Sequence, residues 1–343
     1  MLTETPPALL DQESRDPRPP GWAAVAERLW ANKNPEGHTL AGLAYSGTVI
    51  EGRDCWVYRA AAPAIPFSLA VKLYKPRASR PFPIRLQMQR HRLCAKKMAG
   101  TGGYTVPQPV AGFPPRQIVV MEWIDGPSAR DLMRTVILKR DAYRELLVRA
   151  GRWLGCFHGV SKPKTEALPV ERLIEGLDRR VLKSHPHIGN DPVYAAADRT
   201  IRELAPLLDG REMEQVEVHG DFTPSNLLID RDRTIGIDFG ATRRLPHYYD
   251  ICRFLVHLEA QRPAPKWLGA RPQNFAAEAF LEGYGDHAPP ASGDIMNYMM
   301  LIEVLRRWAA VGVANGSIPA RLLRSIETRR LRAMAVGLTK ALA

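Results

Sequence analysis

The sequence lacks the features of a secreted, membrane-spanning or zinc-binding protein. Its cysteines, Cys55, Cys94, Cys156 and Cys252, form no C-x-x-C pair, which argues against a zinc knuckle and a disulfide framework. No stretch approaches the ~20 apolar residues that a membrane-spanning helix needs. The first residues are acidic and rich in proline, where a signal peptide has a basic start and an apolar run. We therefore expect a cytoplasmic protein whose residues 1–20 are disordered.

Acidic residues are almost missing from two segments of the chain. Residues 72–97 hold nine Lys or Arg and no Asp or Glu, and residues 306–343 hold eight against the single Glu327. Such basic segments bind an anionic substrate, make weak peripheral contact with a membrane surface, or form solvated helix faces. Zinc-finger spacing and aromatic residues interleaved with basic ones are also lacking. Nucleic acid is therefore not an expected partner.

The first part of the chain has the pattern of strands. β-branched and aromatic residues predict three antiparallel strands within residues 38–50, 55–62 and 67–75. Residues 83–100 begin with proline and end with glycine, which is typical of a helix. The apolar run within residues 117–126 predicts one more strand that ends in a turn.

The second part of the chain is mainly helical. A capping box begins at Ser128, and residues 142–160 carry apolar side chains at helical spacing. The remaining predicted helical segments are residues 171–210, 272–285 and 293–339. The whole pattern predicts an α+β protein with two lobes. The small antiparallel-sheet N-lobe would span residues 21–124, and the larger, mainly helical C-lobe would span residues 125–343.

Polar side chains stand at the ends of two short apolar strands in residues 218–240. These strands flank the turn "DRDR", so they predict a hairpin that gathers Asp221, Asn226 and Asp238 in one place. Clustered carboxylates need a positive partner when water is excluded, and oxygen donors of this kind suit Mg²⁺. The sequence therefore predicts a Mg²⁺ site, although the same residue types also serve as plain turn residues.

This motif resembles that of a known family. The H-G-D sequence that ends at Asp221 is followed by an Asn five residues later and by D-F-G seventeen residues later. This spacing resembles the aminoglycoside phosphotransferase and choline kinase group, whose fold is like that of protein kinases. The resemblance implies an ATP- and Mg²⁺-dependent enzyme that moves a γ-phosphoryl group to a hydroxyl of a small molecule. It implies Asp221 as the catalytic base and Asn226 and Asp238 as metal ligands.

Further segments resemble the nucleotide-binding lobe of this family. The sequence "LAVKLYK" is similar to the strand that carries the family's phosphate-binding lysine, here Lys72. The preceding hairpin resembles the phosphate loop and implicates Gly52 and Arg53. The segment "VVMEWIDG" resembles the hinge that holds adenine through backbone groups, which implicates the Glu122 carbonyl and the Ile124 amide.

One departure from the family pattern concerns the partner of Lys72. Kinases pair this lysine with a glutamate from the helix of the small lobe, but residues 84–98 contain no acidic residue. Gln89, between Leu86 and Leu93 on one predicted face, is the expected substitute.

Three further polar residues are interpreted as supports of the fold rather than as catalytic groups. His219 and His158 are expected to be buried and hydrogen bonded, and Asp250 is expected to cap a helix.

The sequence leaves the phosphate acceptor open. A sugar, a sugar phosphate, an amino alcohol and an anionic glycolipid head group all fit, whereas polycationic aminoglycosides suit a chain of net charge +12 poorly. A protein kinase is disfavoured by Gly220 and by the lack of an A-P-E segment. A nucleotide-binding pseudokinase that acts as a scaffold is favoured by the missing glutamate and disfavoured by the complete motif.

Overall fold

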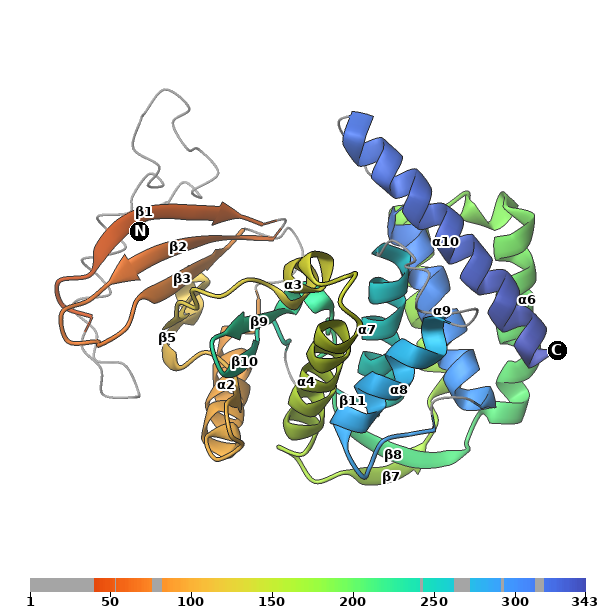
Figure 1. Cartoon of the computed structure of the whole chain (residues 1–343), viewed down its shortest axis with the longest axis horizontal. Coiled ribbons are helices and arrows are strands. Elements are labelled where there is room, and N and C mark those ends of the chain that lie inside the picture. Colours follow the sequence, from red (N-terminus) through yellow and green to blue (C-terminus); the bar gives the residue numbers. More distant parts are fainter. Residues whose placement is uncertain are drawn as a thin grey trace. The chain divides into compact units, whose positions relative to one another are not determined.

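The protein forms two compact units, which are described separately. The computed structural model describes residues 40–52, 54–75, 82–240, 243–261, 272–290, 293–311 and 318–343. The units are Met1–Gly126 and Pro127–Ala343. The first holds an antiparallel sheet and one long helix, and the second is mainly helical (Figure 1). The segment expected to be disordered, residues 1–20, lies outside the described residues.

The first unit is built on a five-stranded antiparallel sheet. Its strands, in spatial order, are β1 (Ala44–Glu51), β2 (Cys55–Ala61), β3 (Leu69–Tyr74), β6 (Ile118–Glu122) and β5 (Pro109–Phe113). The four strands predicted from the apolar pattern are confirmed. Strand β5 was not predicted because Pro109 and Gly112 interrupt it, and its place at the edge of the sheet explains why both are tolerated.

Strand β3 is buried on both faces, so its Lys72 side chain is buried as well. Leu69 and Val71 belong to one apolar core, whereas Tyr74 packs in a second core with α2 (Ile84–Met98). Since side chains alternate along a strand, Lys72 shares the face of Tyr74. Its ammonium group lies 5.1 Å from the centroid of the Tyr74 ring, and the residue is only 7% exposed. Lys72 is therefore an integral part of this second core.

The rotation of α2 about its axis differs from the prediction. Gln89 is exposed, as are Leu86 and Leu93, so the expectation that Gln89 replaces the missing glutamate is wrong. The helix is fixed instead by Ile84 and Met88, which pack on the sheet. Because residues three and four positions apart share a helix face, this rotation buries the neighbouring Gln87.

The side-chain amide of Gln87 is buried on the face of α2 that packs on the sheet. It exchanges hydrogen bonds with the Tyr74 hydroxyl at 3.0 and 3.1 Å. The buried polar residues of α2 are Gln87, Arg90 and His91, so none of them is a carboxylate.

Buried His91 makes the first unit sensitive to acid. Its Nε2 lies 2.7 Å from the Pro107 carbonyl oxygen. Burial, together with the charges of Arg92 and Lys72, lowers the pKa of His91 to about 4 against the opposing effect of this hydrogen bond. In the unfolded chain a histidine has a pKa of about 6.5. Between these values the unfolded state binds a proton that the folded state does not, so stability falls as pH falls.

We expect His91→Gln to reduce the acid sensitivity of the protein. Glutamine can still donate an N–H toward the Pro107 carbonyl but does not titrate. Lowering the pH from 7 to 5 should therefore destabilise the wild type by about 2 kcal/mol more than the variant. Thermal unfolding at both pH values measures this, with the exposed His187→Gln as the control. An equal loss in wild type and His91→Gln would contradict the assignment of acid sensitivity to His91.

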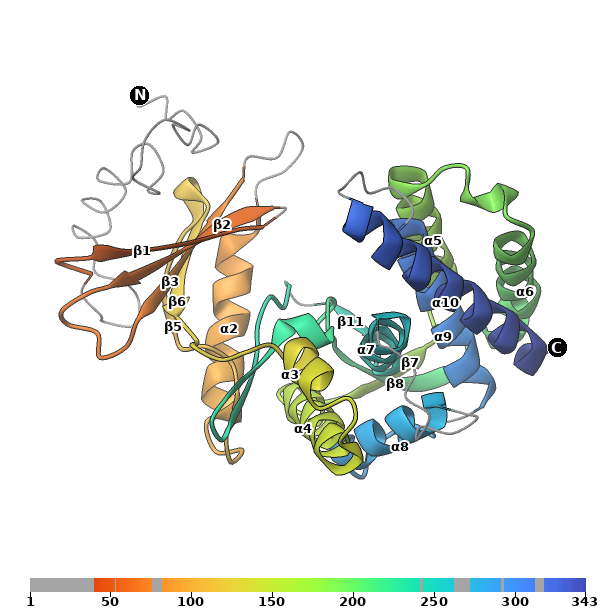
Figure 2. The same ribbon diagram turned by 45° about the horizontal axis from the view of Figure 1, so that its top comes forward.

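The second unit consists of helices with two small groups of strands. Its helices are α3 (Ala129–Thr135), α4 (Arg140–His158), α5 (Val170–Ser184), α6 (Pro192–Leu208), α7 (Tyr248–Gln261), α8 (Pro272–Tyr284), α9 (Asp294–Val311) and α10 (Ile318–Leu342). Helix α7 packs against α8, α9 and α10 (Figure 2). None of the described helices is both long and apolar enough to cross a membrane.

The strands of the second unit were predicted only in part. Strands β9 (Leu227–Asp230) and β10 (Arg233–Gly236) form the predicted hairpin around "DRDR". Strands β11 (Arg244–Pro246), β8 (Glu212–Glu217) and β7 (Lys164–Ala167) form a separate antiparallel sheet that was not predicted. The predicted helical segment 171–210 is divided into α5 and α6, because Asp191 accepts the amides of Val193 and Tyr194 and begins a new helix.

Helices α4 and α8 approach each other through glycine. A β-carbon at Gly151 or Gly155 would collide with the backbone of Phe280 or Tyr284, and one at Gly283 would collide with the backbone of Val148. The absence of side chains at these three positions lets the helix backbones touch. This contact places Tyr284 of α8 against the C-terminal end of α4.

Candidate active site

The β9–β10 hairpin brings the predicted Asp221 and Asn226 together. Asn226 ends the short 3₁₀ helix Pro224–Asn226 that precedes β9. Its Nδ2 donates to the Asp221 carbonyl oxygen at 2.8 Å and lies 3.4 Å from Asp221 Oδ2. With Nδ2 engaged in this way, the Asn226 side-chain oxygen is left as a ligand atom. The metal-binding role of Asn226 stays a prediction.

Asp238 lies two residues after the end of β10. The backbone N–H of Ile237 donates to the Asn226 carbonyl at 2.9 Å, which ties the chain before Asp238 to the loop that holds Asn226. Asp238 is exposed and has a left-handed backbone with φ of 63°, a conformation that Asp tolerates better than most residues. The described residues contain no group of three or more His, Cys, Asp or Glu side chains that could hold a metal. The predicted metal ligands are one carboxylate, Asp238, and one amide, Asn226, whose oxygen atoms are donors of the kind that suits Mg²⁺.

Arg253 holds the Asp221 carboxylate through only one of its two oxygens, Oδ1. This oxygen accepts hydrogen bonds from Arg253 Nε at 3.0 Å and from Arg253 Nη2 at 2.5 Å. The Asp221 side chain is 55% exposed. Arg253 therefore fixes the direction of the carboxylate and leaves Oδ2 as the less engaged oxygen.

Arg253 belongs to a buried network that the sequence did not predict. Its Nη1 donates to Glu303 Oε1 of α9 at 2.8 Å, and Arg306 lies 3.6 Å from the other Glu303 oxygen. Burial by itself lowers the pKa of Arg253, but Glu303 and Asp221 raise it above its ordinary value. Glu303 is a single acid within the apolar run "MMLIEVL", and that isolation is the sequence signal that could have found it.

Asp250 holds residues 219–226, the predicted catalytic loop, and the expectation that it caps a helix is wrong. It lies in the first turn of α7, is completely buried and accepts the backbone N–H groups of His219 at 2.5 Å and Gly220 at 2.9 Å. Burial alone raises the pKa of Asp250, but its bonds to His158 and Gly220 and the nearby His219 hold the pKa below the ordinary value. The carboxylate is thus a buried anchor for the backbone that precedes Asp221.

Both histidines are buried and hydrogen bonded, as predicted. His158 Nε2 lies 3.1 Å from Asp250, and its Nδ1 lies 2.8 Å from the Tyr284 hydroxyl. His219 Nε2 lies 2.9 Å from the Ile237 carbonyl, and its Nδ1 accepts the Asp221 amide at 3.3 Å. The histidines therefore hold the loop rather than face a substrate.

Aromatic rings support the same loop. Phe222, next to Asp221, stacks on Trp153 and on Phe254 at centroid distances of 5.4 and 5.1 Å. Phe222 is fully buried. The chain reverses direction at Gly220, whose φ of 86° is accessible to glycine and costly for other residues. Buried aromatic side chains thus support the backbone next to the exposed Asp221.

The predicted nucleotide-binding residues lie in the first unit. Gly52 closes the turn between β1 and β2 by donating to the Cys55 carbonyl at 2.8 Å, while Arg53 lies outside the described residues. Glu122 is buried, and its side chain accepts the Gln108 amide at 3.1 Å. The half-buried Ile124 has no hydrogen-bond partner for its amide in the described part of the chain. This amide is therefore free to donate to a ligand.

The segment around Ile124 is held by a clamp that the sequence did not predict. Arg59 of β2 donates to both carboxylate oxygens of Asp125, at 2.8 and 2.7 Å. Trp123 Nε1 donates to the same carboxylate at 2.9 Å. A bidentate pair of this kind fixes orientation as well as distance. It fixes the backbone on both sides of Ile124.

Comparison with known families identifies the chain. A model of the phosphotransferase enzyme family, APH, matches residues 57–293, a range that includes Lys72, the catalytic loop and Asp250. The chain belongs to the phosphotransferase enzyme family. This confirms the resemblance inferred from the H-G-D and D-F-G motifs. No curated protein sequence matches the chain significantly.

Solved structures share the fold of this family member. A choline/ethanolamine kinase family protein from Mesorhizobium loti has a TM-score of 0.56 and 16% identity, covering 93% of this chain and 98% of its own. An amicoumacin kinase in complex with AMP-PNP and Ca²⁺ has a TM-score of 0.58 and 15% identity, covering 91% and 92%. A glucosamine kinase in complex with glucosamine, ADP and inorganic phosphate has a TM-score of 0.53 and 19% identity, covering 93% and 84%. The predicted α+β, protein-kinase-like fold is confirmed.

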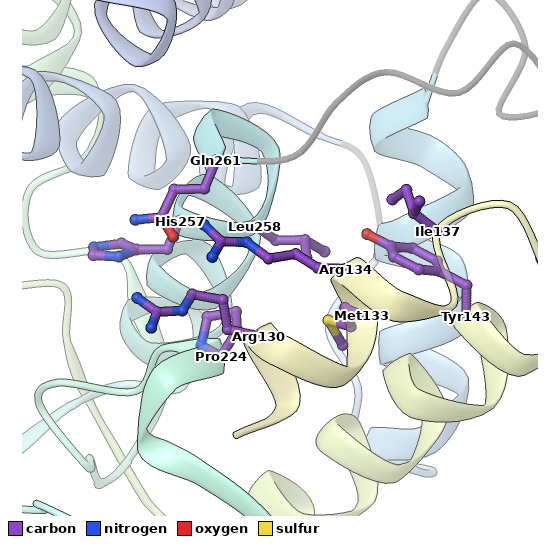
Figure 3. Close-up of a pocket in the computed structure, with 9 residues that line it drawn as sticks. All are labelled: Arg130, Met133, Arg134, Ile137, Tyr143, Pro224, His257, Leu258 and Gln261. Carbon is purple, nitrogen blue, oxygen red and sulfur yellow. The ribbon is translucent and has the colours of Figure 1, made fainter. Parts of the chain in front are cut away.

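A cavity lies beside the catalytic loop of this phosphotransferase. It has an empty volume of about 320 Å³ and is bounded by α3, α7 and Pro224 of the 3₁₀ helix. Arg130 and Arg134 of α3 both extend their guanidinium groups toward His257 and Gln261 of α7 (Figure 3). The cavity adjoins the loop of Asp221 but contains none of the residues predicted for the nucleotide or the metal.

Proposed function

We propose that the protein transfers the γ-phosphoryl group of ATP to a hydroxyl of a small molecule and requires Mg²⁺. The observation that carries this proposal is the exposed Asp221, which rests beside Asn226 on a loop anchored by buried Asp250. An exposed carboxylate on a rigid, buried support is suited to accept a proton from a substrate. The known structures that share the fold add support, since two of them hold AMP-PNP or ADP.

The residues of the chain have separate roles in this reaction. Asn226 and Asp238 would hold Mg²⁺, which when bound would offset the negative charge of the phosphates. Lys72 adds a positive charge to the phosphates, and its buried stem limits its movement. The Ile124 amide donates to the adenine. Asp221 accepts the proton of the acceptor hydroxyl through Oδ2, while Arg253 holds Oδ1. A well-placed base contributes about 10²–10⁴-fold to the rate.

A nucleotide-binding scaffold is the second candidate. The observation in its favour is that α2, the helix from which kinases provide a carboxylate for the lysine, has no acidic residue, and its buried Gln87 is bonded to Tyr74. Transfer of labelled phosphate from ATP to pooled hydroxyl metabolites separates the two functions. A phosphorylated product supports the enzyme, and nucleotide binding without any product supports the scaffold.

We expect ATP with Mg²⁺ to stabilise the folded protein, and Asp238→Ala to remove most of this effect. At a ligand concentration 100 times the dissociation constant, binding adds about 2.7 kcal/mol to the free energy of unfolding. The rise in melting temperature measures this with and without Mg²⁺. Asp232→Ala, an exposed turn residue of the same hairpin, is the matched control and should respond like the wild type. An undiminished Mg²⁺-dependent shift in Asp238→Ala would refute the metal assignment.

A further inference from the structure

A second cavity, within the helical unit, is lined by arginine. It is a hollow on the surface whose empty space, including the part open to solvent, is about 330 Å³. Its basic residues come from three parts of the chain: Arg172 and Arg179 from α5, Arg243 from the segment before β11, and Arg306 from α9. Tyr249 of α7 completes the polar lining, and no acidic side chain belongs to it. We call this the arginine cavity.

The charge of the arginine cavity is only partly balanced. The Arg306 side chain is 15% exposed, and its Nε is buried without a hydrogen-bond partner in the described part of the chain. Its carboxylate neighbour, Glu303, is shared with Arg253. Arg179 has a partner in Glu175, but at 3.8 Å and on the solvent-exposed side of α5. Cations gathered around a hollow in this way favour an anion between them.

Tyr249 fixes the position of two of these arginines. The guanidinium carbons of Arg243 and Arg306 lie 4.9 and 5.2 Å from the centroid of its ring. The Tyr249 hydroxyl also accepts a hydrogen bond from Arg306 Nη1 at 2.8 Å. Two like charges held at one ring repel each other, and an anion that lies near both offsets this repulsion. Fixed guanidinium groups are also the preferred ligands of phosphate oxygens.

The arginine cavity is linked to the proposed base by short contacts. Arg306 contacts Glu303, Glu303 contacts Arg253, and Arg253 contacts Asp221. Tyr249 stands next to Asp250, which anchors the catalytic loop. All of these residues belong to the second unit. None of the cavity residues belongs to the set assigned to ATP or Mg²⁺, so the cavity is available for a different phosphate.

We propose that the arginine cavity binds the phosphate group of the acceptor, so that the substrate is a phosphorylated alcohol. This inference rests on the proposed function, because it takes Asp221 as the site where the acceptor hydroxyl reacts. The acceptor phosphate lies between Arg243, Arg306 and the α5 arginines, and its hydroxyl is directed toward Asp221. The reaction joins the γ-phosphorus of ATP to the acceptor oxygen, releases ADP and passes the hydroxyl proton to Asp221. The product carries two phosphate groups.

The double variant Arg172→Gln, Arg243→Gln tests the cavity without touching the catalytic network. Both side chains are exposed, so their loss should not unfold the protein. Isothermal titration with inorganic phosphate, without nucleotide, is expected to show a dissociation constant at least about tenfold higher in the variant. Lys183→Gln, an exposed cation on the same helix, should bind phosphate like the wild type. Unchanged phosphate binding in the double variant overturns the inference.

Transfer assays distinguish this inference from the proposed function. The probes are labelled ATP with glucose, glucose 6-phosphate, gluconate and vesicles that contain phosphatidylinositol phosphate. Transfer to a phosphorylated probe, with a KM raised about tenfold and a nearly unchanged kcat in the double variant, supports the inference. Comparison of glucose 6-phosphate with the vesicles shows whether the acceptor phosphate belongs to a soluble metabolite or to a lipid head group. Transfer only to glucose or gluconate overturns the inference and leaves the proposed function intact. Phosphate binding that depends on the arginines, without transfer to any of these probes, leaves the anion site, overturns its role in binding the acceptor and favours the scaffold over the enzyme.

Discussion

Asp221→Asn is expected to lower phosphate transfer by about 10²-fold or more while nucleotide affinity stays within a few-fold. Asparagine has nearly the same size as aspartate and can still accept the Arg253 hydrogen bonds, but it cannot accept a proton from the acceptor. The change therefore removes the base and keeps the loop. Single-turnover transfer with labelled ATP measures the chemical step, and titration with ATP and Mg²⁺ measures affinity.

The control for this prediction is Asp286→Asn, an exposed aspartate of the same unit that has no assigned role. It should keep normal turnover. Near-normal transfer by Asp221→Asn would show that another group takes the proton, and the mechanism would fail. A large parallel loss of ATP affinity would place Asp221 in nucleotide binding instead.

Asp250→Asn should destabilise the protein and also reduce transfer, although Asp250 has no contact with a substrate in the proposed mechanism. The buried carboxylate accepts two backbone N–H groups and one histidine N–H. An amide presents one acceptor oxygen, so its NH₂ group must face a donor. Loss of a hydrogen bond to a charged group costs about 1.5–3 kcal/mol. Because His219 and Gly220 lead directly to Asp221, transfer should fall at least about tenfold.

Denaturant unfolding and single-turnover transfer measure the two effects of Asp250→Asn. Asp191→Asn is a matched control, because Asp191 also accepts two backbone amides but lies at the start of a helix, where asparagine is an equally good cap. A positioning role predicts lower kcat with unchanged affinity for ATP. Full stability together with full transfer in Asp250→Asn would show that the loop does not depend on this anchor.

Local sequence signals predicted the hairpin and the core strands well. The "DRDR" turn between two apolar runs specifies the β9–β10 pair, and alternating residues specify β1 to β3. The rotation of α2 was harder, since Leu86 and Leu93 suggested the wrong face. In the fold both are exposed, and Ile84 and Met88 pack on the sheet. Apolar residues alone do not reveal a helix's buried face when both faces carry them.

The supporting network could not be predicted because its members are distant in sequence. Arg253 and Glu303 are fifty residues apart, and they meet through the packing of α7 on α9. The role of Asp250 was misread for a related reason. Its place at the start of a helix suggested a local cap, whereas its partners are thirty or more residues earlier in the chain. Long-range pairing of charges depends on tertiary contacts that no local pattern contains.

The glycine contact between α4 and α8 has a consequence for how the sequence can change over time. In a library of all single substitutions, variants at Gly151, Gly155 and Gly283 should be depleted about as strongly as variants of the catalytic loop, since any β-carbon there pushes two backbones apart. Movement of α8 would carry Tyr284 away from His158 and weaken the support of Asp250. Tolerance to mutation will therefore be as low at these positions, which never meet a substrate, as in the catalytic loop, whereas the exposed α5 positions that line the arginine cavity are expected to vary.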